Sequence, residues 1–194
     1  MILLFAVTLG LACTMVRARL THRTLKFVHL KWDWLVIICV LPQIIAFYIP
    51  AVGKAIPDEI IPFIQISSML GLVIFSLANL FSPGFLALGA GLMSNFIVIA
   101  ANGGWMPISV DTLTRMFPHR PADYWIIGSR LGQTKDLIMA PADTRLAWLS
   151  DRFLLPAGLP QNVAFSLGDV LLSIGAFLLL WSLSRKEVEV KEIT

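Results

Sequence analysis

Apolar residues along the 194-residue chain gather into five runs, separated by short polar stretches and one long one. The runs cover residues 1–16, 34–52, 60–81, 85–101 and 163–182. Each is close to the roughly 20 residues with which a helix crosses about 30 Å of hydrocarbon. Only the last run contains a formal charge, Asp169. This pattern predicts an all-α integral membrane protein with five transmembrane helices.

The composition favours the same class of protein. Hydrophobic residues make up 57% of the chain and charged residues 14%, whereas soluble domains are about half apolar and a quarter charged. The mean hydropathy is +0.81. The net charge of +3 does not indicate a nucleic-acid partner, because the basic residues cluster beyond the end of an apolar run. The expected surroundings are therefore a lipid bilayer.

Basic residues follow the first apolar run before any acidic residue occurs. They are Arg17, Arg19, Arg23, Lys26 and Lys31. Cytoplasmic loops are rich in Lys and Arg, so this connection is expected inside the cell and the N-terminus outside. A signal peptide carries its positive charge before the apolar run, so residues 1–16 are expected to remain as an anchor. Alternation then places residues 103–161 outside and the tail, residues 184–194, inside, in a multi-pass protein of the cytoplasmic membrane.

The segment 103–161 is longer than a simple connection needs, and such segments usually have structure or function of their own. We expect a structured extracytoplasmic cap between the fourth and fifth helices. Within it, Leu146, Leu149 and Phe153 follow a helical spacing, which predicts an amphipathic helix over Ala142–Leu155 on the membrane surface. The cap is either a lid over the helix ends or a surface on which a partner docks.

Polar residues recur at steps of three and four along the third, fourth and fifth runs. The candidate polar site comprises Gln65, Ser68, Asn95, Ser166, Asp169 and Ser173. Polar side chains in spanning helices normally face other helices. At about 1.5 Å per residue, Asp169 and Asn95 both lie about 10 Å below the outer surface. We expect Asp169 and Asn95 to meet there, together with Gln65 or Ser68.

Two interpretations of this site compete. A carboxyl group in hydrocarbon is costly, which favours a proton or cation site. Alternatively, a protonated or amide-bonded Asp169 holds the helices together, since burial raises a carboxyl pKa. No second acid occurs in a run for aspartyl-protease chemistry, and no His or Cys pattern suits zinc or haem. We therefore predict no catalytic residue, no metal and no cofactor.

A glycine-containing turn follows the fourth run. Gly103 and Gly104 suit the positive φ that ends a helix, and Pro107 forbids its continuation. This explains the glycines, but it does not explain why Asn102, Met106 and Pro107 accompany them. We regard these five residues as a candidate structural turn.

Two separated motifs resemble those of an uncharacterised family of bacterial multi-spanning membrane proteins, a domain of unknown function. They are the Asn-Gly-Gly-x-Met-Pro turn after residues 92–101 and the Ser-x-Gly-Asp-Val sequence that begins at Ser166, with Leu149-Ser150-Asp151 between them. The likeness covers roughly residues 81–181. It implies a multi-pass protein of the bacterial cytoplasmic membrane with no established activity.

These observations leave two classes of function open. The first is a non-enzymatic membrane subunit or accessory protein, whose cap binds a protein partner or a second copy of the chain. The second is a small transporter or a proton- or cation-coupled membrane protein that uses the Asp169 cluster. An enzyme is not expected, because no second titratable group shares the acid-base work.

Overall fold

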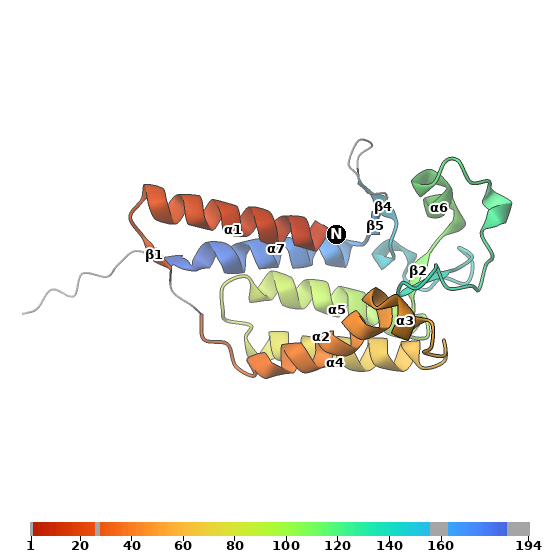
Figure 1. The fold of residues 1–194 in the computed structure, drawn as a ribbon, viewed down its shortest axis with the longest axis horizontal. Coiled ribbons are helices and arrows are strands. Elements are labelled where there is room, and N and C mark those ends of the chain that lie inside the picture. Colours follow the sequence, from red (N-terminus) through yellow and green to blue (C-terminus); the bar gives the residue numbers. More distant parts are fainter. Residues whose placement is uncertain (1, 26–27, 156–162, 186–194) are drawn as a thin grey trace, which may run out of the picture.

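Five apolar helices dominate the computed structural model, which describes residues 2–25, 28–155 and 163–185. They are α1 (Ile2–Leu20), α2 (Asp33–Tyr48), α4 (Ile61–Ala78), α5 (Phe85–Ala101) and α7 (Leu167–Ser182). The closely packed pairs are α1 with α7, α7 with α5, α5 with α4, and α4 with α2. The helices run alongside one another, and a small cap of loops, strands and a short helix covers one end (Figure 1).

The second apolar run forms two helices instead of the single helix expected over residues 34–52. Ile49, which precedes Pro50, is extended with φ −106° and ψ 97°. A residue before proline avoids the helical conformation, so α2 ends at Tyr48. Pro50 then begins the short helix α3 (Pro50–Gly53), since its missing N–H is tolerated in a first turn.

The first helix is longer than the run 1–16 from which it was expected. It continues through Arg17, whose guanidinium carbon lies 4.2 Å from the centroid of the Trp181 ring on α7. The Arg17 Nη1 atom also donates a hydrogen bond of 3.3 Å to the carbonyl of Trp181. At this end of the helices, β1 (Thr24–Leu25) pairs in antiparallel fashion with β6 (Ser184–Arg185). The rest of the expected tail, residues 186–194, lies outside the described residues.

The last helix begins four residues later than the run 163–182. Residues 164–165 instead form β5 (Ala164–Phe165), and Ser166 caps α7. The run 60–81 forms α4 over a shorter range, Ile61–Ala78, whereas α5 has the bounds of its run.

The expectation of an all-α protein is wrong in the cap, because the cap contains short strands. β2 (Met106–Ile108) pairs in parallel with β3 (Asp136–Ile138), and β4 (Phe153–Leu154) pairs with β5 in antiparallel fashion. Between β2 and β3 lie α6 (Val110–Met116) and a 3₁₀ turn, η1 (Ala122–Tyr124). Residues 156–161 of the expected cap lie outside the described residues.

The amphipathic helix expected over Ala142–Leu155 is also wrong. Its helical part is one 3₁₀ turn, η2 (Ala147–Leu149), preceded by Leu146 in a left-handed conformation with φ 54°. Leu149 is buried with Met69, Val98, Ile99 and Met106, and Leu146 packs against that cluster. Leu146 and Leu149 therefore pack with residues of α4 and α5.

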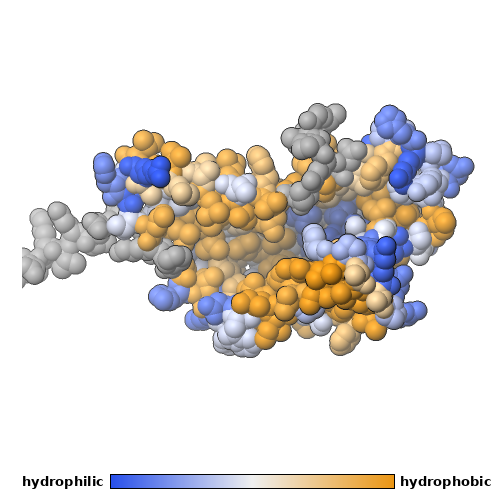
Figure 2. Space-filling view, viewed as in Figure 1, coloured by the Kyte–Doolittle hydropathy of each residue, from blue (hydrophilic) through white to orange (hydrophobic). Residues whose placement is uncertain are grey.

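Large apolar side chains are widely exposed on the five long helices. Phe63 is 75% exposed, Leu86 72% and Ile37 67%. The visible face of the helical region is mostly hydrophobic, and hydrophilic residues gather towards its two ends (Figure 2). By length and composition, α1 and α4 could cross a membrane, whereas α2, α5 and α7 are shorter apolar helices. The described part of the chain thus contains two candidate spans, fewer than the five predicted.

Candidate functional site

Asp169 lies in the first turn of α7 and takes part in a capping box. The Asp169 backbone N–H donates to Ser166 Oγ at 3.1 Å, and the Ser166 backbone N–H donates to Asp169 Oδ2 at 3.1 Å. This arrangement satisfies two of the N–H groups that a helix leaves without partners at its start. The Ser-x-Gly-Asp sequence is therefore a helix start.

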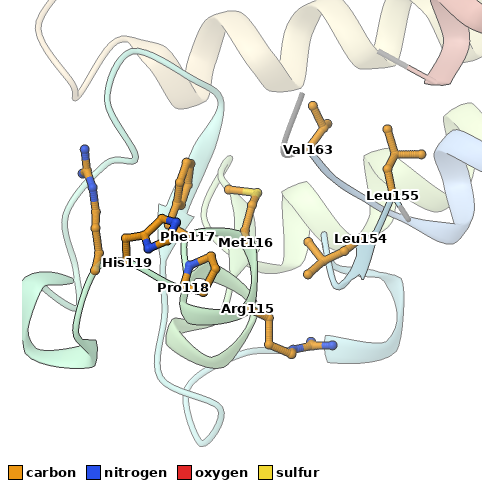
Figure 3. A pocket seen from close by; sticks show the side chains of 9 residues that line it. Arg115, Met116, Phe117, Pro118, His119, Leu154, Leu155 and Val163 are labelled. Atoms are coloured by element: carbon orange, nitrogen blue, oxygen red, sulfur yellow. The ribbon is translucent and has the colours of Figure 1, made fainter. Parts of the chain in front are cut away.

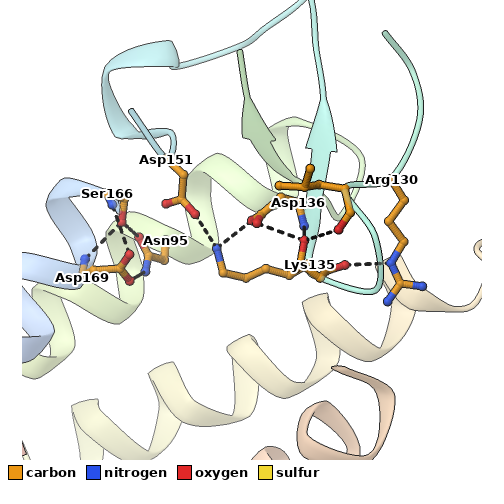
Figure 4. Close-up of polar contacts among 9 residues, drawn as sticks. Asn95, Arg130, Lys135, Asp136, Asp151, Ser166 and Asp169 are labelled. Atoms are coloured by element: carbon orange, nitrogen blue, oxygen red, sulfur yellow. Dashed lines mark hydrogen bonds and ion pairs between the residues drawn. The ribbon is translucent and has the colours of Figure 1, made fainter. Parts of the chain in front are cut away.

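Asn95 of α5 joins this capping box to the neighbouring helix. Its Nδ2 atom donates to Asp169 Oδ1 at 3.0 Å, and its Oδ1 atom accepts a hydrogen bond of 2.9 Å from Ser166 Oγ. A side chain at Gly168 would overlap the Asn95 amide, so glycine permits this close approach. The structure brings together three of the residues selected from the sequence, and both oxygens of Asp169 accept hydrogen bonds (Figure 4).

The other candidate residues do not join this network. Gln65 and Ser68 are buried on α4, but no hydrogen bond links either of them to Asn95 or Asp169. Gln65 Oε1 and Ser173 Oγ are buried without a hydrogen-bond partner in the described part of the chain.

Asp169 also lies nearer to its helix end than expected. It is the third residue of α7, so it stands about 3 Å along the helix axis and not about 10 Å. Asn95 remains about 10 Å from the end of α5, since seven residues separate it from Asn102, which follows the last residue of that helix. The start of α7 is thus set back from the end of α5, and residues of the cap lie beyond it.

A second polar cluster lies next to the first, in the cap. Lys135 Nζ lies 2.8 Å from Asp151 Oδ2 and 3.1 Å from Asp136 Oδ1. The Asp151 side chain is only 4% exposed, and its Oδ1 atom has no hydrogen-bond partner among the described residues. Figure 4 shows Asp151 and Lys135 between the capping box of α7 and the strand β3.

The strand β2 holds the two partners of this ion pair. The Met106 N–H donates to the Lys135 carbonyl at 3.1 Å, and the Asp151 N–H donates to the Pro107 carbonyl at 3.2 Å. Met106 and Pro107 are both fully buried. The backbone of Met106 and Pro107 thus positions Lys135 and Asp151, while the Met106 side chain is buried in the apolar cluster with Met69, Val98, Ile99 and Leu149.

The charges in this cluster alter one another's protonation. Burial raises the pKa of Asp151 to about 7; the carboxylates of Asp136 and Asp169 also raise it, whereas Lys135 opposes them. Burial alone would lower the pKa of Lys135, but the carboxylates of Asp136, Asp151 and Asp169 together raise it above its ordinary value. Asp151 can therefore exchange a proton near neutral pH while Lys135 stays charged.

Asn102 connects the helix end to the cap. Its Nδ2 atom donates to the carbonyls of Val98 at 2.7 Å and Arg145 at 2.8 Å, and its Oδ1 atom accepts from the Arg145 N–H at 2.9 Å. Gly103 and Gly104 follow with φ values of 70° and 91°, and a side chain at Gly104 would overlap Pro62 of α4. The five residues of the turn thus end α5 and position both the cap and α4.

Lys135 and Asp136 are not among the site residues predicted from the sequence, and Asp151 is marked there only by the family resemblance. One available signal is the position of Lys135 and Asp136 directly before the apolar sequence Leu137-Ile138-Met139. When an apolar strand is buried, charged residues at its start also lie close to the core. Their meeting with Asp151 depends on a parallel strand pairing, for which the sequence has no local signal.

The site offers hydrogen-bonding groups and one buried carboxyl group, Asp151, whose pKa is raised. Within the described ranges, no group of three or more His, Cys, Asp or Glu side chains could hold a metal ion. A cavity of about 500 Å³ lies elsewhere in the cap, between the end of α6 and β4, and is lined mainly by Met116, Phe117, Leu154 and Leu155 (Figure 3). Asp151 is not among the residues that line it.

Comparison with known proteins adds a family and no activity. No curated protein and no solved structure matches the chain. The model of DUF5317, which is described as a family of unknown function, matches residues 27–181, a wider range than the roughly 81–181 over which the motifs carry the resemblance. Because this match covers most of the sequence, the chain belongs to the DUF5317 family.

Proposed function

We propose that this protein is a non-enzymatic subunit or accessory protein of the bacterial cytoplasmic membrane, with five spans and an extracytoplasmic cap. Support for five spans comes from the short helices α2, α5 and α7, which pack beside α4 or α1 and expose apolar side chains as those two helices do. Their 16 to 17 residues cover about 25 Å, a length that a locally thinned bilayer accommodates.

The orientation follows from the two ends of the helices. The start of α1 and the cap lie at one end, while β1 and β6 lie at the other (Figure 1). The last turn of α1 and the connection that contains β1 carry Arg19, Arg23 and Lys31, with no acidic residue before Asp33. The positive-inside rule therefore favours an extracytoplasmic cap and a cytoplasmic β1–β6 end.

The engagement of Asp169 is the observation that carries the non-enzymatic proposal. Both of its carboxylate oxygens accept hydrogen bonds, from Asn95 and from the backbone of Ser166, in an arrangement that caps α7 and joins it to α5. A group that carries protons or cations must exchange partners, whereas these bonds satisfy one fixed geometry. Asp169 therefore fits a structural role better than a transport role.

Membrane topology can be tested by cysteine labelling in a background that lacks Cys13 and Cys39. Ala142→Cys places an exposed thiol in the cap, and Thr21→Cys places one at the β1 end. An impermeant maleimide added to spheroplasts should label the first variant, and it should label the second only after lysis. The reverse pattern, or release of the protein from membranes by alkaline carbonate, would contradict the proposal.

A proton-coupled role is the second candidate, and the observation that favours it is Asp151. This buried acid has a pKa of about 7 and an unpartnered oxygen beside Lys135. The two roles separate in liposomes that contain the purified protein and a pH-sensitive dye. The accessory role predicts no proton flux above that of empty liposomes and co-purification of a fixed partner. Flux that Asp151→Asn abolishes would replace it with the proton-coupled role.

Asp169 itself provides a test of the structural role. Asp169→Ala removes two hydrogen bonds, one to Asn95 and one that forms half of the capping box, so it should lower the free energy of unfolding in detergent by about 2 kcal/mol. Asp111→Ala is a matched control, because Asp111 is an exposed acid in the first turn of α6 whose ion pair with Arg115 is at the surface. The control should change stability by less than about 0.5 kcal/mol. Equal stability of the two variants would exclude the structural role.

A further inference from the structure

A second cavity in the cap, which we call the Arg120 pocket, lies between the end of α6 and β3. Its volume is about 590 Å³, within the range of sites that hold small molecules. The residues that carry the argument are Arg120, Trp125, Ile126, Leu131 and Ile138, all of which line it. Asp151 and Asp169 are not among its lining residues, so this pocket is separate from the polar clusters described above.

Arg120 supplies a positive charge without an acidic partner. Its guanidinium carbon lies 4.5 Å from the centroid of the Tyr124 ring and 5.6 Å from that of Trp125. Within the described part of the chain, Arg115 pairs with Asp111 and Arg130 with Asp58, but no carboxylate pairs with Arg120. Stacking on aromatic rings orients a guanidinium and leaves its N–H fork free to bind a carboxylate in bidentate fashion.

Trp125 supplies an aromatic wall to the pocket. The residue is only 8% exposed and lines the pocket together with Tyr124. Its Nε1 atom is buried out of reach of a water-sized atom, so a ligand in the pocket contacts the indole ring and not this N–H group. A ring of this kind offers an apolar surface to a bound molecule.

The rest of the pocket is apolar. Leu131 and Ile138 belong to its walls, and Ile126 contributes a rim that is 70% exposed. The segment that carries Tyr124 and Ile126, coloured teal in Figure 1, lies at the far end of the molecule from β1 and β6, beyond the ends of the helices. In the proposed orientation, membrane lipid does not cover this rim.

We propose that the Arg120 pocket binds a small carboxylate with an apolar body. The carboxylate accepts hydrogen bonds from the Arg120 guanidinium, and the apolar body packs against the Trp125 ring, Leu131 and Ile138. The neighbouring cavity of Figure 3 fits such a ligand less well. Arg120 also lines that cavity, but the Tyr124 and Trp125 rings that its guanidinium faces line the Arg120 pocket and not the neighbouring one. The other arginine of that cavity, Arg115, is paired with Asp111.

The test compares three probes of one shape and different charge: benzoate, benzamide and benzamidine. The full chain is held in lipid nanodiscs, and the indole N–H resonance of Trp125 is assigned by its loss in Trp125→Phe. Benzoate should shift this resonance in a saturable way. Benzamide should bind at least tenfold more weakly, and benzamidine should produce no saturable shift. Equal shifts from all three probes, or none from benzoate, would overturn the proposal.

Two substitutions test the contribution of the charge. Arg120→Gln should weaken benzoate binding by tenfold or more, whereas Arg115→Gln, on the neighbouring cavity, should leave it unchanged. The other tryptophan resonances show whether each variant keeps its fold. If Arg120→Gln does not fold, Arg120→Lys replaces it, because lysine keeps the charge and loses the bidentate fork. Benzoate binding that is insensitive to the folded variant would contradict the proposal.

Discussion

Asp151 and Asp169 are two acids at the same end of the helices with different surroundings. Asp169 accepts hydrogen bonds from neutral donors at both oxygens, one from Asn95 and one from Ser166. Asp151 has one oxygen on Lys135 and one without a partner, inside a cluster that contains more negative than positive groups. The sequence drew attention to Asp169 because it stands alone in an apolar run, yet the acid whose pKa is raised by burial is Asp151.

This difference predicts a pH dependence of stability. The pKa of Asp151 is raised from 3.8 to about 7, so between these values the folded protein retains a proton that the unfolded chain releases. The associated stability is complete below the lower value and is lost as pH rises towards 7. Between about pH 5 and pH 8 the free energy of unfolding should fall by about 3 kcal/mol. Lys135 contributes no change in this range, because its raised pKa keeps it charged.

Thermal unfolding in detergent, followed by tryptophan fluorescence, measures this dependence. Asp151→Asn is the matched control, since an amide cannot ionise. The stability of this variant should vary with pH only through its other titratable groups. Subtracting the two profiles isolates the carboxyl group. A wild-type protein that becomes more stable relative to Asp151→Asn as pH rises would show that the pairing with Lys135 outweighs burial.

The helices themselves were largely predictable from the sequence, because each long apolar run lies within the residues that form the helix. Their ends needed finer signals, and those signals were present. Pro50 divides the second run, and the Ser166-x-x-Asp169 spacing marks the start of α7 as a capping box does. The parallel pairing of β2 with β3 was not predictable, since each strand has three residues and 27 residues separate them. The contact between Lys135 and Asp151 depends on that strand pairing, so it was not predictable from the sequence either.

The turn after α5 shows how one helix end organises a longer segment. Asn102 makes two hydrogen bonds to the backbone of Arg145 and one to its own helix. Asn102→Ala removes all three, so it should lower the free energy of unfolding by about 2 to 3 kcal/mol. It should also speed hydrogen exchange at the Arg145 amide, measured by mass spectrometry of peptides from residues 141–150. Thr144→Ala is the control, because Thr144 bonds only to the nearby Ala140 carbonyl. Unchanged exchange in Asn102→Ala would show that packing of Leu146 and Leu149 alone holds the segment.

At the scale of the whole molecule, one interface joins two groups of helices. The close packing runs from α1 through α7 and α5 to α4 and α2, so the α5–α7 contact connects the pair α1–α7 with the other three helices. Glycines on both helices allow this contact. A Cβ atom at Gly91 would lie 2.6 Å from the Gly168 carbonyl oxygen and 2.8 Å from the Leu172 nitrogen, and one at Gly175 would lie 2.5 Å from the Leu88 nitrogen. Small residues of this kind let helix backbones approach closely where apolar burial supplies no driving force.

Gly91→Ala should therefore affect the molecule well beyond its own position. The added methyl group meets backbone atoms that cannot move aside, so α5 and α7 must separate, at a cost of about 1 to 3 kcal/mol. Separation also lengthens the hydrogen bonds between Asn95 and the capping box, since these cross the same interface.

Ala90→Leu is the control, because Ala90 is the exposed neighbour of Gly91 on α5. Unfolding in detergent should show a lower midpoint for Gly91→Ala than for Ala90→Leu. In Gly91→Ala, hydrogen exchange should rise in the first turn of α7 while α2 and α4 stay protected. Equal midpoints would mean that α5 and α7 do not meet through these glycines, and Asp169 would then lose its role as the link between the two groups of helices.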